Sequence, residues 1–115
     1  MKRFAALALA LALVGAAASN MSASAAGGNA AKGKALYASQ CAMCHGATGK
    51  GDGVAGKSLK PAPRDFTTGT FKYGSSDAQI AATIKKGKPP MPGYGSLSDQ
   101  QLKDLVAYIR SLKKK

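Results

Sequence analysis

The sequence predicts an all-α domain of three to four helices joined by long loops. Three segments combine an N-capping residue with apolar residues at helical spacing. No segment shows the sustained alternation of apolar and polar residues that is typical of a half-buried strand. Glycine, proline and lysine are concentrated between the helical segments. These observations predict one small, loop-rich helical domain.

Residues 1–25 have the composition of a cleavable secretory signal peptide. Two cations near the start precede an apolar run over residues 4–14, and small residues follow, which is the order of regions in such signals. The run is shorter than the roughly 20 residues that a membrane-spanning helix needs. We expect cleavage after Ala25, or alternatively after Ala18, and export to a bacterial periplasm. The functional domain would cover residues 26–115, with no membrane span after cleavage.

The first expected helix runs from about Asn29 to Gln40. Asn29 is a suitable N-cap, and Leu36 and Tyr37 follow at helical spacing. Gly33 lies inside this helix, where glycine costs up to about 1 kcal/mol relative to alanine. The position therefore indicates the close approach of another backbone.

The second expected helix spans residues 77–86, and the third spans residues 99 to about 113. Each is preceded by a serine with a glutamine three residues further on, which is the capping-box pattern. Gly87 follows the second helix and is a typical stop. The third helix has an apolar face made of Leu102, Leu105, Val106, Ile109 and Leu112.

Residues 46–76, between the first two helices, contain no clear element. A structureless loop of this length is unusual in a compact domain, unless it wraps around a large group that is not protein. The domain also lacks an obvious staple, because a disulfide between its two cysteines, Cys41 and Cys44, would close a loop too short to stabilise the fold. A small domain usually needs such a staple.

The stretch CAMCH, Cys41 to His45, allows three kinds of chemistry. A thioredoxin-like dithiol requires a preceding strand, and a structural zinc site requires four ligands, whereas the chain has no further cysteine or histidine. Cys-x-x-Cys-His is the signature of covalently attached haem. We therefore expect one haem c per chain, bound to Cys41 and Cys44, with His45 as an iron ligand. The haem would supply the missing core.

The second iron ligand is expected to be Met91. His45 is the only histidine, and a methionine thioether is the common alternative in electron-transfer haem proteins. Met1 and Met21 would leave with the signal peptide, and Met43 lies inside the attachment turn. Met91 remains, framed by three prolines that stiffen its segment.

With these residues in this order, the chain resembles a small bacterial class I cytochrome c. The resemblance is carried by CAMCH, by MPGYG, and by the segments AAKGKALYASQ and SDQQLKDLVAYIRSLKKK, and it covers nearly all of residues 28–115. It implies a cytochrome c fold, in which the loops surround the haem and the N- and C-terminal helices cross. Gly33, Tyr37 and Tyr108 match the family positions at that crossing.

The same resemblance implies that a proline carbonyl holds His45 through its free ring N–H. Pro61 and Pro63 are the two candidates, and Pro61 is preferred. Aromatic residues of the same loop would pack either on the haem or in the ordinary core: Phe66, Phe71 and Tyr73.

Ligation by His45 and Met91 predicts a one-electron carrier and not an enzyme. Iron with all six positions filled has no open site for a substrate, and a thioether ligand favours the ferrous state. If the Met91 bond were weak, the protein would instead be a haem-based ligand sensor or a peroxidase-like enzyme. A third alternative is an electron-transfer subunit of a larger oxidoreductase. The small size of the domain favours a free, monomeric carrier.

The chain is strongly basic, with a formal net charge of +12. Without the two cations of the signal, 15 basic and 5 acidic residues remain, a net charge of +10. Such a field attracts acidic partners. No nucleic-acid-binding motif is present, so we expect redox proteins with acidic docking surfaces and no nucleic acid. Lys85, Lys86 and Lys88 precede Met91 and are the candidate docking residues.

Overall fold

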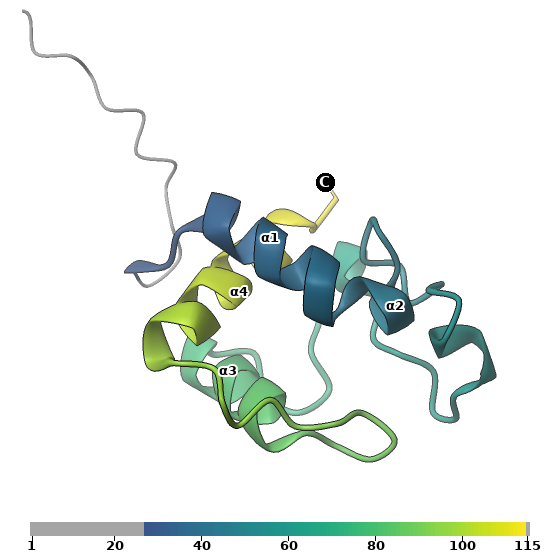
Figure 1. The fold of residues 1–115 in the computed structure, drawn as a ribbon. Helices are drawn as coiled ribbons and strands as arrows, with labels where there is room; N and C mark the ends of the chain where they lie inside the picture. The colour runs from purple at the N-terminus through teal and green to yellow at the C-terminus, as the bar shows by residue number, and fades with distance from the viewer. Residues whose placement is uncertain (1–26, 115) are drawn as a thin grey trace, which may run out of the picture.

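The computed structural model describes residues 27–114, and the expected signal peptide lies outside this range. The described residues contain helices and no named strand, which confirms the all-α prediction. The α-helices, shown in Figure 1, are α1 (Ala30–Gln40), α2 (Ala42–His45), α3 (Asp77–Lys86) and α4 (Asp99–Ser111). Two short 3₁₀ turns, Gly56–Ser58 and Phe66–Thr68, lie in the loop between α2 and α3.

The helices begin where the capping residues predict. The Asn29 side chain accepts a hydrogen bond from the backbone N–H of Lys32 at 3.1 Å, and both expected capping boxes, before α3 and before α4, are complete. The bounds of α3 agree with the prediction, whereas α4 ends at Ser111, two residues early. The chain leaves the helix there because the N–H of Lys114 bonds to the carbonyl of Thr67 at 2.9 Å.

Helices α1 and α4 cross in close contact at Gly33 (Figure 1). A Cβ atom at Gly33 would lie 1.9 Å from the carbonyl oxygen of Asp104, so no side chain fits between the two backbones. One turn further on, the rings of Tyr37 and Tyr108 meet edge to face, with centroids 5.1 Å apart. The expected crossing of the first and last helices is confirmed.

The core lies between α4 and the helices packed against it. Its buried side chains come from α1, α3, α4 and the loop: Tyr37, Phe66, Ile80, Ile84, Leu102, Leu105, Val106 and Ile109. One carboxylate is buried with them, that of Asp104, which accepts hydrogen bonds from the Asn29 backbone N–H at 2.8 Å and from Gln100 Nε2 at 2.9 Å. Both bonds compensate for its burial.

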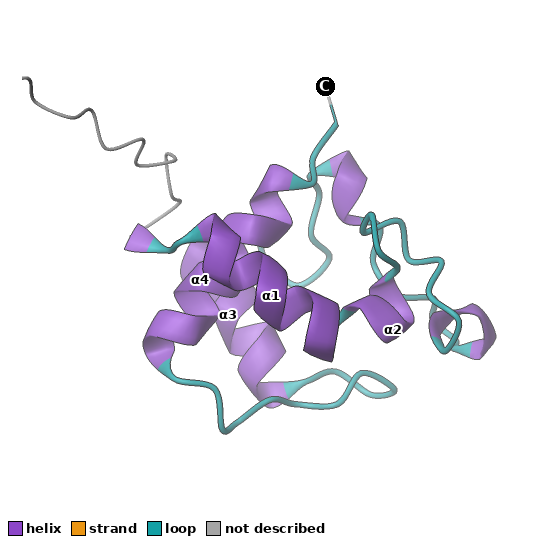
Figure 2. Ribbon diagram, turned by 45° about the horizontal axis from the view of Figure 1, so that its top comes forward, coloured by secondary structure: helices purple, strands orange, loops and turns teal. Residues whose placement is uncertain are grey.

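An ion pair joins α3 to α4. Arg110 Nε donates to Asp77 Oδ1 at 2.5 Å, and the same guanidinium donates to the Ser75 carbonyl. Figure 2 shows that the segments between α2 and α3 and between α3 and α4 are mostly loop. Across residues 27–114, no helix has the length and apolar character needed to cross a membrane.

Candidate cofactor site

The four residues expected to hold a cofactor line one cavity of about 570 Å³. Cys41, Cys44 and His45 reach it from the α2 segment, and Met91 reaches it from the loop between α3 and α4. Positions 50 residues apart in the sequence thus share one site. We call residues 87–94, which carry Met91, the Met91 loop.

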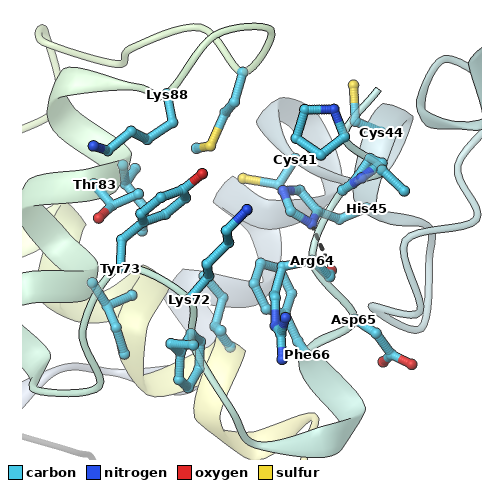
Figure 3. Close-up of a pocket in the computed structure, with 18 of the residues that line it drawn as sticks. Cys41, Cys44, His45, Arg64, Asp65, Phe66, Lys72, Tyr73, Thr83 and Lys88 are labelled. Atoms are coloured by element: carbon cyan, nitrogen blue, oxygen red, sulfur yellow. Dashed lines mark hydrogen bonds between the residues drawn. The ribbon is translucent and has the colours of Figure 1, made fainter. Parts of the chain in front are cut away.

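Helix α2 is a single turn that carries the CAMCH stretch. It begins at a break after α1, and the N–H of His45 bonds to the carbonyl of Cys41 at 2.9 Å. Gly46, with φ of 85°, ends it in a conformation that favours glycine. The turn places Cys41, Cys44 and His45 side by side on one wall (Figure 3). Cys41 and Cys44 form no disulfide, so both thiols are available for covalent attachment.

The His45 ring is held in a single orientation. Its Nδ1 lies 3.1 Å from the carbonyl oxygen of Arg64, and the ring stacks on Phe66 with centroids 4.4 Å apart. A carbonyl only accepts, so Nδ1 carries the hydrogen and Nε2 keeps its lone pair. Burial lowers the pKa of His45, and the bond to Arg64 opposes this only in part. The imidazole is therefore neutral and has a free nitrogen for a metal.

The expectation that a proline carbonyl supports His45 is wrong for both candidates. The residue that accepts is Arg64, directly after Pro63. The carbonyl of Pro63 is directed at Gly51, where a Cβ atom would lie only 2.5 Å from it. Pro61 and Pro63 line the cavity without making this bond.

Arg64 is a site residue that the sequence did not reveal. Its Nε donates to the Thr70 carbonyl at 2.8 Å, and its Nη2 donates to the Thr70 hydroxyl. The side chain thus fixes the backbone segment whose carbonyl holds His45. No local sequence pattern marks such a residue, because the bond between His45 and the Arg64 carbonyl depends on the path of the loop that brings Arg64 back to His45.

The interior of the cavity is largely apolar. Phe66, Phe71 and Tyr73 all line it, and Phe66 is also part of the buried core, so the two expected roles of these aromatic residues overlap. Two cations lie beside Tyr73. Lys88 Nζ is 4.6 Å from the centre of the Tyr73 ring, and Lys72 Nζ is 5.6 Å from it (Figure 3).

The residues present fit a large apolar group with anionic substituents. Ligand cavities usually enclose about 300–1,000 Å³, and here two cysteines, a histidine and a methionine line the interior. Burial, and then the neighbouring Cys44, raise the pKa of Cys41 to about 11, so its thiol is protonated at neutral pH. Within residues 27–114, no three His, Cys, Asp or Glu side chains are grouped so that they could hold a metal ion.

Comparison with known proteins gives the family. Residues 28–109 match the family model described as cytochrome C oxidase, cbb3-type, subunit III. The chain belongs to this cytochrome c family, and its cofactor is covalently bound haem c with iron.

Small c-type cytochromes are similar to this chain over their whole length. Cytochrome c-554(547) of Halothiobacillus neapolitanus is 37% identical, and the match covers 75% of this chain and 99% of that protein. Among solved structures, the c-type cytochrome KustC0563 is 30% identical with a TM-score of 0.56, over 71% of this chain and 98% of the other.

Other relatives are much longer. The match to a thiosulfate dehydrogenase of Psychrobacter arcticus is 38% identical and covers 73% of this chain but 26% of the relative. The match to subunit FixP of the cbb3-type cytochrome c oxidase of Azorhizobium caulinodans is 36% identical. It covers 72% of this chain and 27% of the relative. The chain thus spans about a quarter of the length of these relatives.

Proposed function

We propose that this protein is a periplasmic one-electron carrier whose iron is ligated by His45 and Met91. The observation that carries the proposal is the shared cavity, which brings a neutral imidazole and a thioether to one site. In the proposal, the thiols of Cys41 and Cys44 attach the haem, and residues 1–25 direct export and are removed.

Haem c supplies an iron that is reversibly oxidised and reduced by one electron. The Arg64 carbonyl keeps Nδ1 of His45 protonated and Nε2 available, so the imidazole needs no proton loss to act as a ligand. The Met91 thioether favours the ferrous state. With both ligands in place no open position remains for a substrate, so we propose that the protein is not an enzyme.

The carrier would dock on acidic redox partners through lysines at the end of α3 and in the Met91 loop. Lys85 and Lys86 end α3, Lys88 lies within the Met91 loop itself, and all three side chains are exposed. Positive charge at a helix C-terminus also interacts favourably with the helix dipole, so these lysines stabilise α3 whether or not they bind a partner. We propose a monomer that meets its partners transiently.

The longer relatives suggest one other function. Similarity to a thiosulfate dehydrogenase favours an electron-transfer or catalytic role with thiosulfate. An assay with thiosulfate as electron donor and ferricyanide as acceptor distinguishes a carrier from an enzyme that oxidises thiosulfate. The carrier proposal expects no turnover above the rate without protein, and sustained turnover would favour an enzyme.

The ligand assignment is tested by the absorption spectrum of the oxidised holo-protein. Sulfur ligation to ferric haem gives a weak far-red band that disappears on reduction. We expect the band in the wild type, its loss in Met91→Leu, and its retention in Met43→Leu. Met43 is a matched control because it lies in the attachment turn and its side chain is 67% exposed. A band that survives in Met91→Leu would contradict Met91 ligation.

A further inference from the structure

Tyr94 ties the Met91 loop to the segment that carries the cysteines. Its hydroxyl donates to the carbonyl of Gln40 at 2.8 Å, across 54 positions of sequence. Gln40 is the last residue of α1 and directly precedes Cys41. Gln40 and Tyr94 both line the cavity, so the bond joins two of the segments that form it.

The backbone of Tyr94 is fixed as well. Its N–H donates to the carbonyl of Ile84 in the last turn of α3 at 3.0 Å. Carbonyls in the last turn of a helix have no partner within the helix, and both bonds of Tyr94 satisfy such groups. Burial raises the pKa of the Tyr94 hydroxyl, which keeps it a donor at neutral pH.

The remainder of the Met91 loop is closed on itself. The N–H of Met91 bonds to the carbonyl of Lys88 at 2.6 Å, and a Cβ atom at Gly87 would lie 2.6 Å from the nitrogen of Gly93. These contacts join residues near the two ends of the loop. The distance of the loop from the cysteine segment then depends on the few bonds that leave it, and the Tyr94 hydroxyl makes one of these.

We propose that Tyr94 is a positioning residue that holds the Met91 loop against the cysteine segment and so limits how readily Met91 leaves the iron. The inference rests on the proposed ligation by Met91. It concerns a hydroxyl that does not itself touch the iron.

The test is Tyr94→Phe in the oxidised holo-protein, titrated with imidazole as a competing ligand. The variant keeps the aromatic ring and loses only the hydrogen bond to the Gln40 carbonyl. Since a hydrogen bond of this kind contributes roughly a factor of five to ten, we expect imidazole to bind about five to ten times more tightly than to the wild type. Tyr108→Phe is the control, because Tyr108 lies at the α1–α4 crossing and not at the cavity. We expect it to bind imidazole as the wild type does.

A second measurement separates positioning from general stability. In urea, the far-red band of Tyr94→Phe should disappear at a lower concentration than the helical circular dichroism signal, with a wider gap than in the wild type. An imidazole affinity equal to that of the wild type, or loss of both signals together, would overturn the role of Tyr94. Absence of the far-red band from the wild type would instead refute the proposed Met91 ligation.

Discussion

Tyr37 makes the most completely buried side-chain hydrogen bond near the attachment turn. Its side chain is 1% exposed, and its hydroxyl donates to the carbonyl of Gly46 at 2.7 Å. Burial strongly raises the pKa of Tyr37, so the hydroxyl remains a donor at all ordinary pH values. The bond holds the residue that ends α2 against the middle of α1.

Replacing this hydroxyl should therefore destabilise the holo-protein. Tyr37→Phe leaves the Gly46 carbonyl buried without its partner, which costs about 1–3 kcal/mol in the free energy of unfolding. Denaturant titration of the oxidised protein measures this. Tyr108→Phe, in the ring that packs on Tyr37, should change stability by less than about 0.5 kcal/mol. Equal effects of the two variants would show that the hydrogen bond has no special weight.

At the residue scale, local sequence motifs predicted the residues that line the cavity. Hydrogen bonds between residues far apart in the sequence were not predicted correctly. CAMCH and the proline-framed methionine indicated four side chains, and the structure brings all four to one cavity. The residue that supports His45 was placed wrongly at Pro61 or Pro63, since which carbonyl reaches a ring depends on the loop path and not on composition. No sequence pattern marks Tyr94 either, because its hydrogen-bond partner lies 54 positions away.

Among the elements, the crossing of α1 and α4 gives the sharpest prediction. An alanine at Gly33 would raise helix propensity by up to about 1 kcal/mol, so the change would stabilise an isolated α1. In the folded protein its Cβ would lie 1.9 Å from Asp104 O and 2.9 Å from Tyr108 Cβ. The steric clash should outweigh the gain in helix propensity, because overpacking costs about 1–3 kcal/mol or more. The two helices would have to move apart to admit the new side chain.

We thus expect Gly33→Ala to lower the urea midpoint of the holo-protein by an amount equivalent to about 2 kcal/mol. The reverse exchange at an exposed α1 position, Ala38→Gly, is the control and should cost no more than about 1 kcal/mol. A Gly33→Ala protein as stable as the wild type would mean that the helices do not cross at this contact.

Element bounds followed from local chemistry where caps were present. The two capping boxes placed the starts of α3 and α4 at the correct residue. The end of α4 was predicted two residues too late, because the three lysines there give no stop signal. The backbone N–H of Lys114 instead bonds to the carbonyl of Thr67 in the loop before α3. Helix α2 was expected only as the turn of the attachment motif, since four residues carry no periodicity.

On the scale of the whole molecule, the charge makes a kinetic prediction. With a strongly positive net charge, oxidation of the reduced protein by ferricyanide, a trianion, should slow as ionic strength rises. Oxidation by a tricationic cobalt(III) complex should become faster under the same conditions. Stopped-flow absorbance measures both rates. Salt dependence of the same sign for both reagents would exclude steering by the protein's charge.

Local placement of the charge is tested by paired reversals. Lys85→Glu with Lys86→Glu should slow the ferricyanide reaction more than Lys32→Glu with Lys34→Glu, which places the same charge change on the exposed side of α1. Equal slowing by the two double variants would locate electron exchange elsewhere on the surface.

The cavity is the whole-molecule feature that sequence reasoning indicated only indirectly. A long loop without structure and a small domain without a staple predicted a large non-protein core. The fold leaves a space of about 570 Å³ between helices and the two long loops. Its cationic wall, with Lys72 and Lys88 beside Tyr73, was not predicted, because it forms only when two distant loops face each other.

The central claim is that His45 and Met91 fill both open positions of one iron. The most direct test is to add carbon monoxide to the reduced holo-protein and to record the visible spectrum. We predict no change in the wild type and a clear shift in Met91→Leu, because only the variant has an open position. A shift in the wild type would contradict the account, since iron that admits carbon monoxide is not held by Met91 and is open to catalysis or sensing.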